Sequence, residues 1–81
     1  MGKVPLYPNP AHSRISFLAA ASTPYRVLNQ LGQLLLSGTT EPGNPSIVIE
    51  TLANGLYFLE LQTVTGRVVQ KFEKEWKPLK W

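Results

Sequence analysis

The chain has 81 residues, a formal net charge of +3 and no cysteine. This length supports one small domain that buries roughly 60–65% of the surface its unfolded form exposes, and the lack of cysteine excludes disulfides and thiolate-bound metal as supports of its core. The mild basic charge aids solubility without specifying a partner. No apolar run approaches the roughly 20 residues of a membrane helix, and the first residues show neither a signal-peptide core nor a myristoylation pattern.

The first third of the chain predicts an extended edge piece and two strands. Residues 4–10 contain three prolines, and because each proline fixes φ and removes a backbone donor, this segment is expected at a sheet edge. Apolar residues alternate with polar ones around Ile15 and again around Val27, which predicts a strand at each place. The small residues at 18–23 between them predict a short exposed loop.

The middle of the chain predicts a hairpin, a long loop and a further strand. Residues 29–33 form a turn in which Gly32 can take a positive φ, and the leucines at 34–36 return as a strand. Residues 37–45 are rich in turn formers and predict the longest loop of the chain. The β-branched residues 47–49 favour a strand that leads into the segment 52–62.

Residues 52–62 join a turn to the clearest strand of the chain. Apolar and polar side chains alternate after Gly55, which predicts a strand with one solvated face. The spacing of Leu52, Gly55 and Tyr57 is that of a tyrosine corner, in which the tyrosine hydroxyl bonds to backbone upstream of its strand. An ordinary turn into a hairpin is the alternative interpretation.

The end of the chain predicts a last hairpin. Residues 63–66 form its turn, and residues 67–72 run back beside the strand of Tyr57, with Val68 and Phe72 pointing inward. About seven short strands separated by turns, without a helical stripe, predict an all-β domain built as an antiparallel β-sandwich.

Few residues offer chemistry. All five acidic residues are glutamates and the single histidine is His12, so the sequence supplies neither an acid–base pair nor a metal site. His12 lies in a polar turn, which favours a solvated imidazole over a ligand. The glycines are scattered at turns and form no phosphate loop. No catalytic residue, metal or cofactor is expected.

Charge is organised only near the C-terminus. Half of the basic residues are the lysines at 71, 74, 77 and 80, and Trp76 and Trp81 lie among them. One interpretation is a solvated edge strand that runs into a disordered tail, because edge lysines prevent unwanted strand pairing. The other is a docking signal. Single-stranded nucleic acid is disfavoured, since base stacking needs aromatic residues within a basic groove.

Four segments, in order, resemble motifs of the C-terminal sorting domain of the type IX (Por) secretion system, and the likeness covers nearly the whole chain. They are the YPNPA segment at residues 7–11, the strand, D/N-x-x-G, strand hairpin at residues 27–34, the L-x-x-G-x-Y segment at residues 52–57 and the K-apolar-x-K segment at residues 71–74.

The resemblance implies an immunoglobulin-like sandwich that is not an enzyme, needs no cofactor and serves as the address of a larger, covalently linked cargo. Cargo of this family crosses the inner membrane of a Gram-negative bacterium with a separate signal peptide. The outer-membrane translocon then recognises the folded domain in the periplasm, and a sortase-like peptidase usually removes it at the surface, so the product is secreted or displayed on the cell.

The resemblance also assigns residues. Recognition by the translocon carries over to Lys71, Phe72 and Lys74. The positions that carry over as fold-shaping are Tyr7, Pro8, Asn9, Pro10, Gly32, Leu52, Gly55 and Tyr57.

The expected organisation is a cloning or linker remnant at residues 1–3, the sorting domain at residues 4–74 and a basic, Trp-containing tail at residues 75–81. The tail departs from the family, whose members commonly stop within a few residues of the K-apolar-x-K motif, so it could mask the signal.

Another class of function is a non-catalytic adhesive or carbohydrate-binding accessory module of an extracellular enzyme, because this fold carries such roles on its loops. Sugar-binding platforms expose several coplanar aromatic rings, whereas here mainly Tyr7, Trp76 and Trp81 are expected outside. A weak homodimer through an edge strand is compatible with either function.

Overall fold

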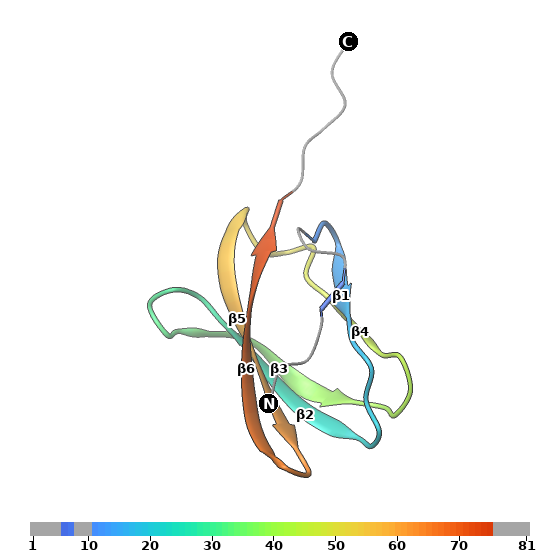
Figure 1. Cartoon of the computed structure of the whole chain (residues 1–81). Coiled ribbons are helices and arrows are strands. Elements are labelled where there is room, and N and C mark those ends of the chain that lie inside the picture. The colour runs from blue at the N-terminus through green and yellow to red at the C-terminus, as the bar shows by residue number, and fades with distance from the viewer. Residues whose placement is uncertain (1–5, 8–10, 76–81) are drawn as a thin grey trace.

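The computed structural model describes residues 6–7 and 11–75, which form two antiparallel sheets packed face to face (Figure 1). The larger sheet has four strands in the order β3-β2-β5-β6, and the smaller sheet pairs β1 with β4. In chain order the strands are β1 (Arg14–Ser16), β2 (Thr23–Leu28), β3 (Leu34–Thr40), β4 (Ser46–Val48), β5 (Gly55–Thr63) and β6 (Gly66–Lys74). The predicted antiparallel β-sandwich is confirmed.

The core forms where the alternating apolar side chains of the two sheets meet. Along β5 the side chains of Tyr57, Leu59 and Leu61 are buried and their neighbours lean toward solvent, as period-two alternation requires. Phe72 on β6 is 1% exposed and Val68, four residues earlier on the same face, is also buried, so both point inward as predicted. The other buried apolar residues are Ala11, Ile15, Phe17, Val27, Ile47, Ile49 and Leu52.

The turn between β2 and β3 is closed by the side chain of Asn29. Its Oδ1 accepts hydrogen bonds from the backbone N–H groups of Leu31 at 2.9 Å and Gln33 at 3.0 Å, as in an Asx-turn. Gly32 has a φ of 84°, which glycine adopts without a steric penalty. The predicted role of Gly32 in this turn is therefore confirmed.

The expected long loop at residues 37–45 is wrong in its first half, because β3 continues to Thr40. Gly38 lies within this strand, opposite Tyr25 of β2. A Cβ atom at Gly38 would lie only 3.0 Å from the Tyr25 ring, so the glycine makes room for an aromatic side chain instead of forming a turn. The expected loop at residues 18–23 is also one residue shorter, since β2 begins at Thr23.

The smaller sheet is extended by short contacts on both sides of β1. Tyr7 exchanges backbone hydrogen bonds of 3.1 and 2.8 Å with Ser16, so the proline-rich segment does touch a sheet edge as expected. Ala19 exchanges two further backbone bonds with Gly43. Because these contacts are isolated bridges, the described residues contain six strands where about seven were expected. No helix in this part of the chain could cross a membrane.

Candidate functional site

Three segments that are distant in sequence meet at the C-terminal end of β6, around Lys74. Lys74 lies opposite Gly55 in the β5–β6 pair, and its Nζ donates a 2.7 Å hydrogen bond to the backbone carbonyl of Leu52. On the other side, Ala11 forms a parallel bridge with Lys74, and the Glu75 N–H donates to the Ala11 carbonyl at 2.8 Å. We call this assembly the motif corner, made of Ala11, Leu52, Ala53, Gly55, Tyr57, Phe72 and Lys74.

The turn before β5 is a tyrosine corner, as predicted. The Tyr57 hydroxyl donates a 2.5 Å hydrogen bond to the backbone carbonyl of Ala53, four residues upstream. Gly55 has a φ of 153°, a conformation that side chains with a Cβ rarely adopt, so it lets the chain turn sharply into the strand. The Tyr57 ring stacks on Phe72 with centroids 5.8 Å apart, which ties the corner to β6.

The Lys-Phe-Glu-Lys motif is divided between the two faces of β6. Lys71 is exposed, whereas Phe72 and Lys74 point into the fold and Lys74 is only 7% exposed. The interpretation of this segment as a solvated edge strand with exposed lysines is therefore wrong at Lys74. Strand alternation places residues 72 and 74 on the same face, and the bond to the Leu52 carbonyl compensates for burying the ammonium group. Lys77 and Lys80 lie outside the described residues.

The outer edge of β6 is partly covered by the N-terminal segment. The N–H of Ala11 donates a 2.8 Å hydrogen bond to the Glu73 carbonyl, so the backbone of residue 73 faces away from β5. Backbone groups alternate along a strand, and the edge positions of the same parity are Arg67, Val69 and Lys71. No other described strand pairs with them. As an edge strand, β6 is therefore without a described partner strand on its outer side at residues 67–71 and is bonded to Ala11 at residue 73.

The remaining fold-shaping candidates lie apart from the corner or outside the described residues. Tyr7 sits on the smaller sheet, is 42% exposed and donates a hydrogen bond from its hydroxyl to the Asn44 side chain. Gly32 occupies the β2–β3 turn, and a shallow hollow separates residues 29–31 of this turn from residues 54–57. Pro8, Asn9 and Pro10 lie outside the described residues.

Sequence reasoning missed that Ala11 pairs with β6. In the sequence, Ala11 stands out only as the last residue of the YPNPA segment. No local pattern links it to Lys74, which lies more than sixty positions away. The inward position of Lys74 did have a signal, because the motif places it two residues after the apolar Phe72.

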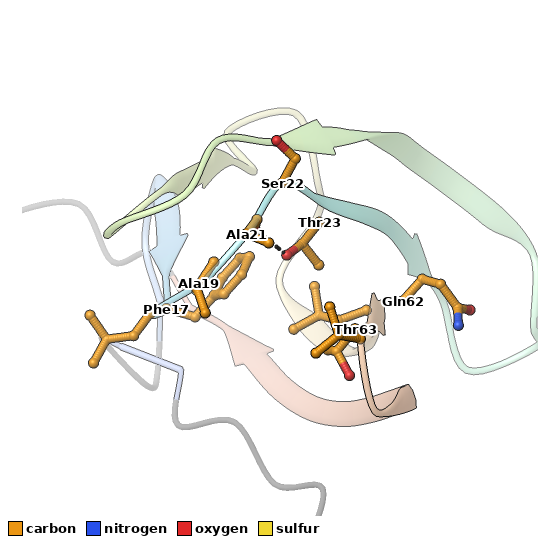
Figure 2. A pocket seen from close by; sticks show the side chains of 11 residues that line it. Phe17, Ala19, Ala21, Ser22, Thr23, Gln62 and Thr63 are labelled. Atoms are coloured by element: carbon orange, nitrogen blue, oxygen red, sulfur yellow. Dashed lines mark hydrogen bonds between the residues drawn. The ribbon is translucent and has the colours of Figure 1, made fainter.

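A hollow of about 220 Å³ lies at the opposite end of β6, between residues 17–23 and residues 61–64 (Figure 2). A 2.8 Å hydrogen bond from the Thr23 hydroxyl to the Ala21 carbonyl lies within this hollow.

His12, the single histidine of the chain, is exposed. No group of three or more metal-binding side chains occurs among the described residues. His12, Ser13, Glu50 and Lys74 line another hollow, next to the motif corner.

Comparison with known proteins gives one family match. The family described as "Secretion system C-terminal sorting domain" matches residues 5–75. None of the curated protein sequences matches the chain.

Two solved structures share the fold. PorZ, described as an essential bacterial surface component of the type IX secretion system of Porphyromonas gingivalis, superposes with a TM-score of 0.66 at 17% identity over 90% of this chain. A single-mutant thermostable endoglucanase from Alicyclobacillus acidocaldarius gives a TM-score of 0.66 at 17% identity over 93% of this chain. The chain spans only 11% of the first protein and 15% of the second. At this identity both show the fold alone, an immunoglobulin-like sandwich as expected.

Proposed function

The chain belongs to the secretion system C-terminal sorting domain family, and from that premise we propose that its motif corner presents Lys71 to the outer-membrane translocon. As a type IX sorting domain, the chain marks a cargo protein for secretion to the cell surface or the medium. The sorting-domain family is non-catalytic, and we propose that this member has no enzymatic activity of its own. The observation that carries the proposed site is the division of the Lys-Phe-Glu-Lys motif between a locked inner face and an exposed outer face.

The three motif residues have different proposed roles. Lys71 is exposed and offers its ammonium group directly to a carboxylate of the receptor. Phe72, stacked on Tyr57, and Lys74, bonded to Leu52, hold the strand that carries Lys71. A receptor that contacts Lys71 therefore meets a preorganised strand, which reduces the entropy lost on binding. Recognition of the folded domain, instead of a linear tail, follows from this arrangement.

The proposed route is that of a Gram-negative cell. A separate signal peptide takes the cargo across the inner membrane, the domain folds in the periplasm, the translocon exports it and a sortase-like peptidase removes it. We propose that residues 4–74 act as the recognised unit, that residues 1–3 are a remnant and that residues 75–81 form a tail. The family match over residues 5–75 supports the extent of the unit.

Secretion of a reporter tests this function. Residues 4–81 are fused behind a fluorescent protein that carries an inner-membrane export peptide, in a type IX-competent host and in an isogenic strain without the translocon. We expect the fusion on the surface or in the medium of the first strain and in the periplasm of the second. The variant with Lys71→Ala, Phe72→Ala and Lys74→Ala should stay in the periplasm of both strains.

A chain cut after Lys74 is the matched control for the tail. If the full fusion is retained and the shortened one is exported, the tail masks the signal. Retention of both in the competent host would contradict the sorting function. Binding to a glycan array that disappears on Trp76→Ala and Trp81→Ala would then favour the accessory module.

A further inference from the structure

A row of side chains crosses the solvent-facing side of the four-stranded sheet and ends at Lys71. The strand registers pair Leu34 of β3 with Leu28 of β2, Leu28 with Phe58 of β5, and Phe58 with Lys71 of β6. Paired residues point to the same face of a sheet, so these four side chains lie side by side. We call them the outer row. With strands about 4.8 Å apart, the row spans roughly 14 Å from one edge of the sheet to the other.

The outer row is unusually apolar for a solvated sheet face. Leu34 is 52% exposed, and Leu28 and Phe58 are partly exposed. Leu56 extends the apolar surface from the same side of β5 and is 39% exposed. Contiguous apolar side chains on a monomer surface commonly mark an interaction site. An aromatic residue near the centre of such a surface is typical of a binding hot spot.

The neighbouring row on the same face is charged. Glu60 forms ion pairs with Arg26 at 3.3 Å and with Arg67 at 3.2 Å. Arg26 lies opposite Glu60 in this row, so their charges balance, whereas Arg67 lies opposite Gln62, outside the row. Lys71 supplies a positive charge at the β6 end of the outer row. The apolar row therefore ends in a positive charge at β6, which favours a partner with a carboxylate at that end.

We propose that the outer row is an extension of the recognition site and binds an apolar segment of the secretion machinery that carries a carboxylate at the end that reaches Lys71. This inference rests on the proposed sorting function, and it assigns Leu34, Leu28 and Phe58 as contact residues. The carboxylate of the partner pairs with the exposed ammonium group of Lys71. The apolar side chains of the partner cover Leu34, Leu28 and Phe58.

A second copy of the domain fits the outer row poorly. If two copies stack with their rows antiparallel, Lys71 of each lies over Leu34 of the other and loses water without gaining a charged partner. If the rows run parallel, two ammonium groups meet. A partner with one acidic end and an apolar body avoids both conflicts, which is why we commit to a heterologous partner.

Leu34→Thr tests the inference. Leu34 is three strands away from Lys71, so the substitution leaves the β6 edge intact, and threonine keeps strand propensity at an exposed position. Leu31→Thr is the matched control, because Leu31 is 83% exposed in the adjacent turn and outside the row. We expect the rate of reporter secretion to fall about tenfold with Leu34→Thr, further with Leu34→Thr plus Phe58→Thr, and less than about twofold with Leu31→Thr.

The outcomes separate the inference from the function beneath it. If neither the parent fusion nor the fusion cut after Lys74 is exported, the sorting function fails. If the parent is exported and Leu34→Thr, folded with the parental melting temperature, is exported equally well, the outer row is not a contact surface and the function stands. Analytical ultracentrifugation of the parent domain decides the remaining case, because a dimer that Leu34→Thr dissociates would assign the row to a second copy and overturn the heterologous partner.

Discussion

The two ends of β6 differ in the side-chain contacts that connect them to the rest of the domain. At the C-terminal end, the motif corner packs Phe72 on Tyr57 and bonds the buried Lys74 to a backbone carbonyl. At the N-terminal end, the β5–β6 hairpin borders the hollow of Figure 2, and Val64 at its tip is 89% exposed. The motif segments at residues 52–57 and 71–74 therefore meet at the end where contacts join distant parts of the chain, whereas the hydrogen bonds of the hairpin turn are local, such as that from the Thr63 hydroxyl to the Gly66 carbonyl at 2.7 Å.

The difference between the two ends of β6 indicates that the sorting motif is part of the fold. A purely linear address would tolerate substitution wherever it leaves the rest of the domain unchanged. Here two of the motif residues are buried in the structure that presents the third. Substitutions at the motif corner should therefore change stability, whereas substitutions of exposed residues at the hairpin tip should leave it unchanged.

The largest expected effect is that of Phe72→Ala. Phe72 is 1% exposed and its ring packs on Tyr57, so truncation leaves a cavity in a thin core. We expect a loss of about 3–5 kcal/mol in the free energy of unfolding, measured by urea denaturation followed by circular dichroism. Val64→Ala at the hairpin tip is the control, with a change within about 0.5 kcal/mol. Equal losses at the two positions would remove the distinction between the ends.

Lys74→Met should have the second largest effect. Methionine preserves much of the buried length of the side chain but leaves the Leu52 carbonyl without its donor. We expect a loss of about 1–3 kcal/mol in the free energy of unfolding. Lys71→Met, three residues earlier on the exposed face, should change stability by less than about 0.5 kcal/mol. An unaltered stability in Lys74→Met would show that the buried ammonium group does not hold the corner.

Tyr57→Phe separates the hydroxyl bond of the motif corner from its aromatic packing, because it removes one hydroxyl and keeps the stack on Phe72. The lost bond to the Ala53 carbonyl should lower the free energy of unfolding by about 0.5–1.5 kcal/mol. Hydrogen exchange at the turn before β5 should quicken more than exchange at the β5–β6 hairpin. Uniform quickening over the whole sheet would mean that the corner is not a separate local unit.

The smallest expected effect is that of Val64→Ser. This side chain is 89% exposed and belongs to the hairpin tip, far along β6 from the motif corner. Both the free energy of unfolding, within about 0.5 kcal/mol, and the secretion of the reporter should match the parent. A secretion defect in this variant, with stability unchanged, would place a recognition surface at the hairpin end.

Local patterns predicted the local structure well and missed what depends on distant packing. The tyrosine corner, the turn at Gly32 and the last hairpin follow from short spacings, and each is present. Gly38 suggested a loop but lies in a strand, because its small size is required by the ring of Tyr25 on the neighbouring strand. Which strand faces that glycine cannot be read from its own neighbours in the sequence.

The candidate site shows the same limit. The motif identified Lys71, Phe72 and Lys74 together, and the structure divides them between two faces. The alternation of the strand was enough to predict that division once Phe72 was placed inward. The pairing of Ala11 with the end of β6 was not predictable in this way, since it joins the two ends of the domain and depends on the path of the whole chain.

The most direct test of the account is reporter secretion of Lys71→Glu beside Arg67→Glu. Both residues are exposed, basic and on the same edge and face of β6, but only Lys71 belongs to the motif. We expect the two variants to keep near-parental melting temperatures, Lys71→Glu to be retained in the periplasm and Arg67→Glu to be exported at a rate much closer to that of the parent. Export of folded Lys71→Glu at the parental rate would mean that Lys71, which the motif corner holds in place, is not the residue that the translocon recognises.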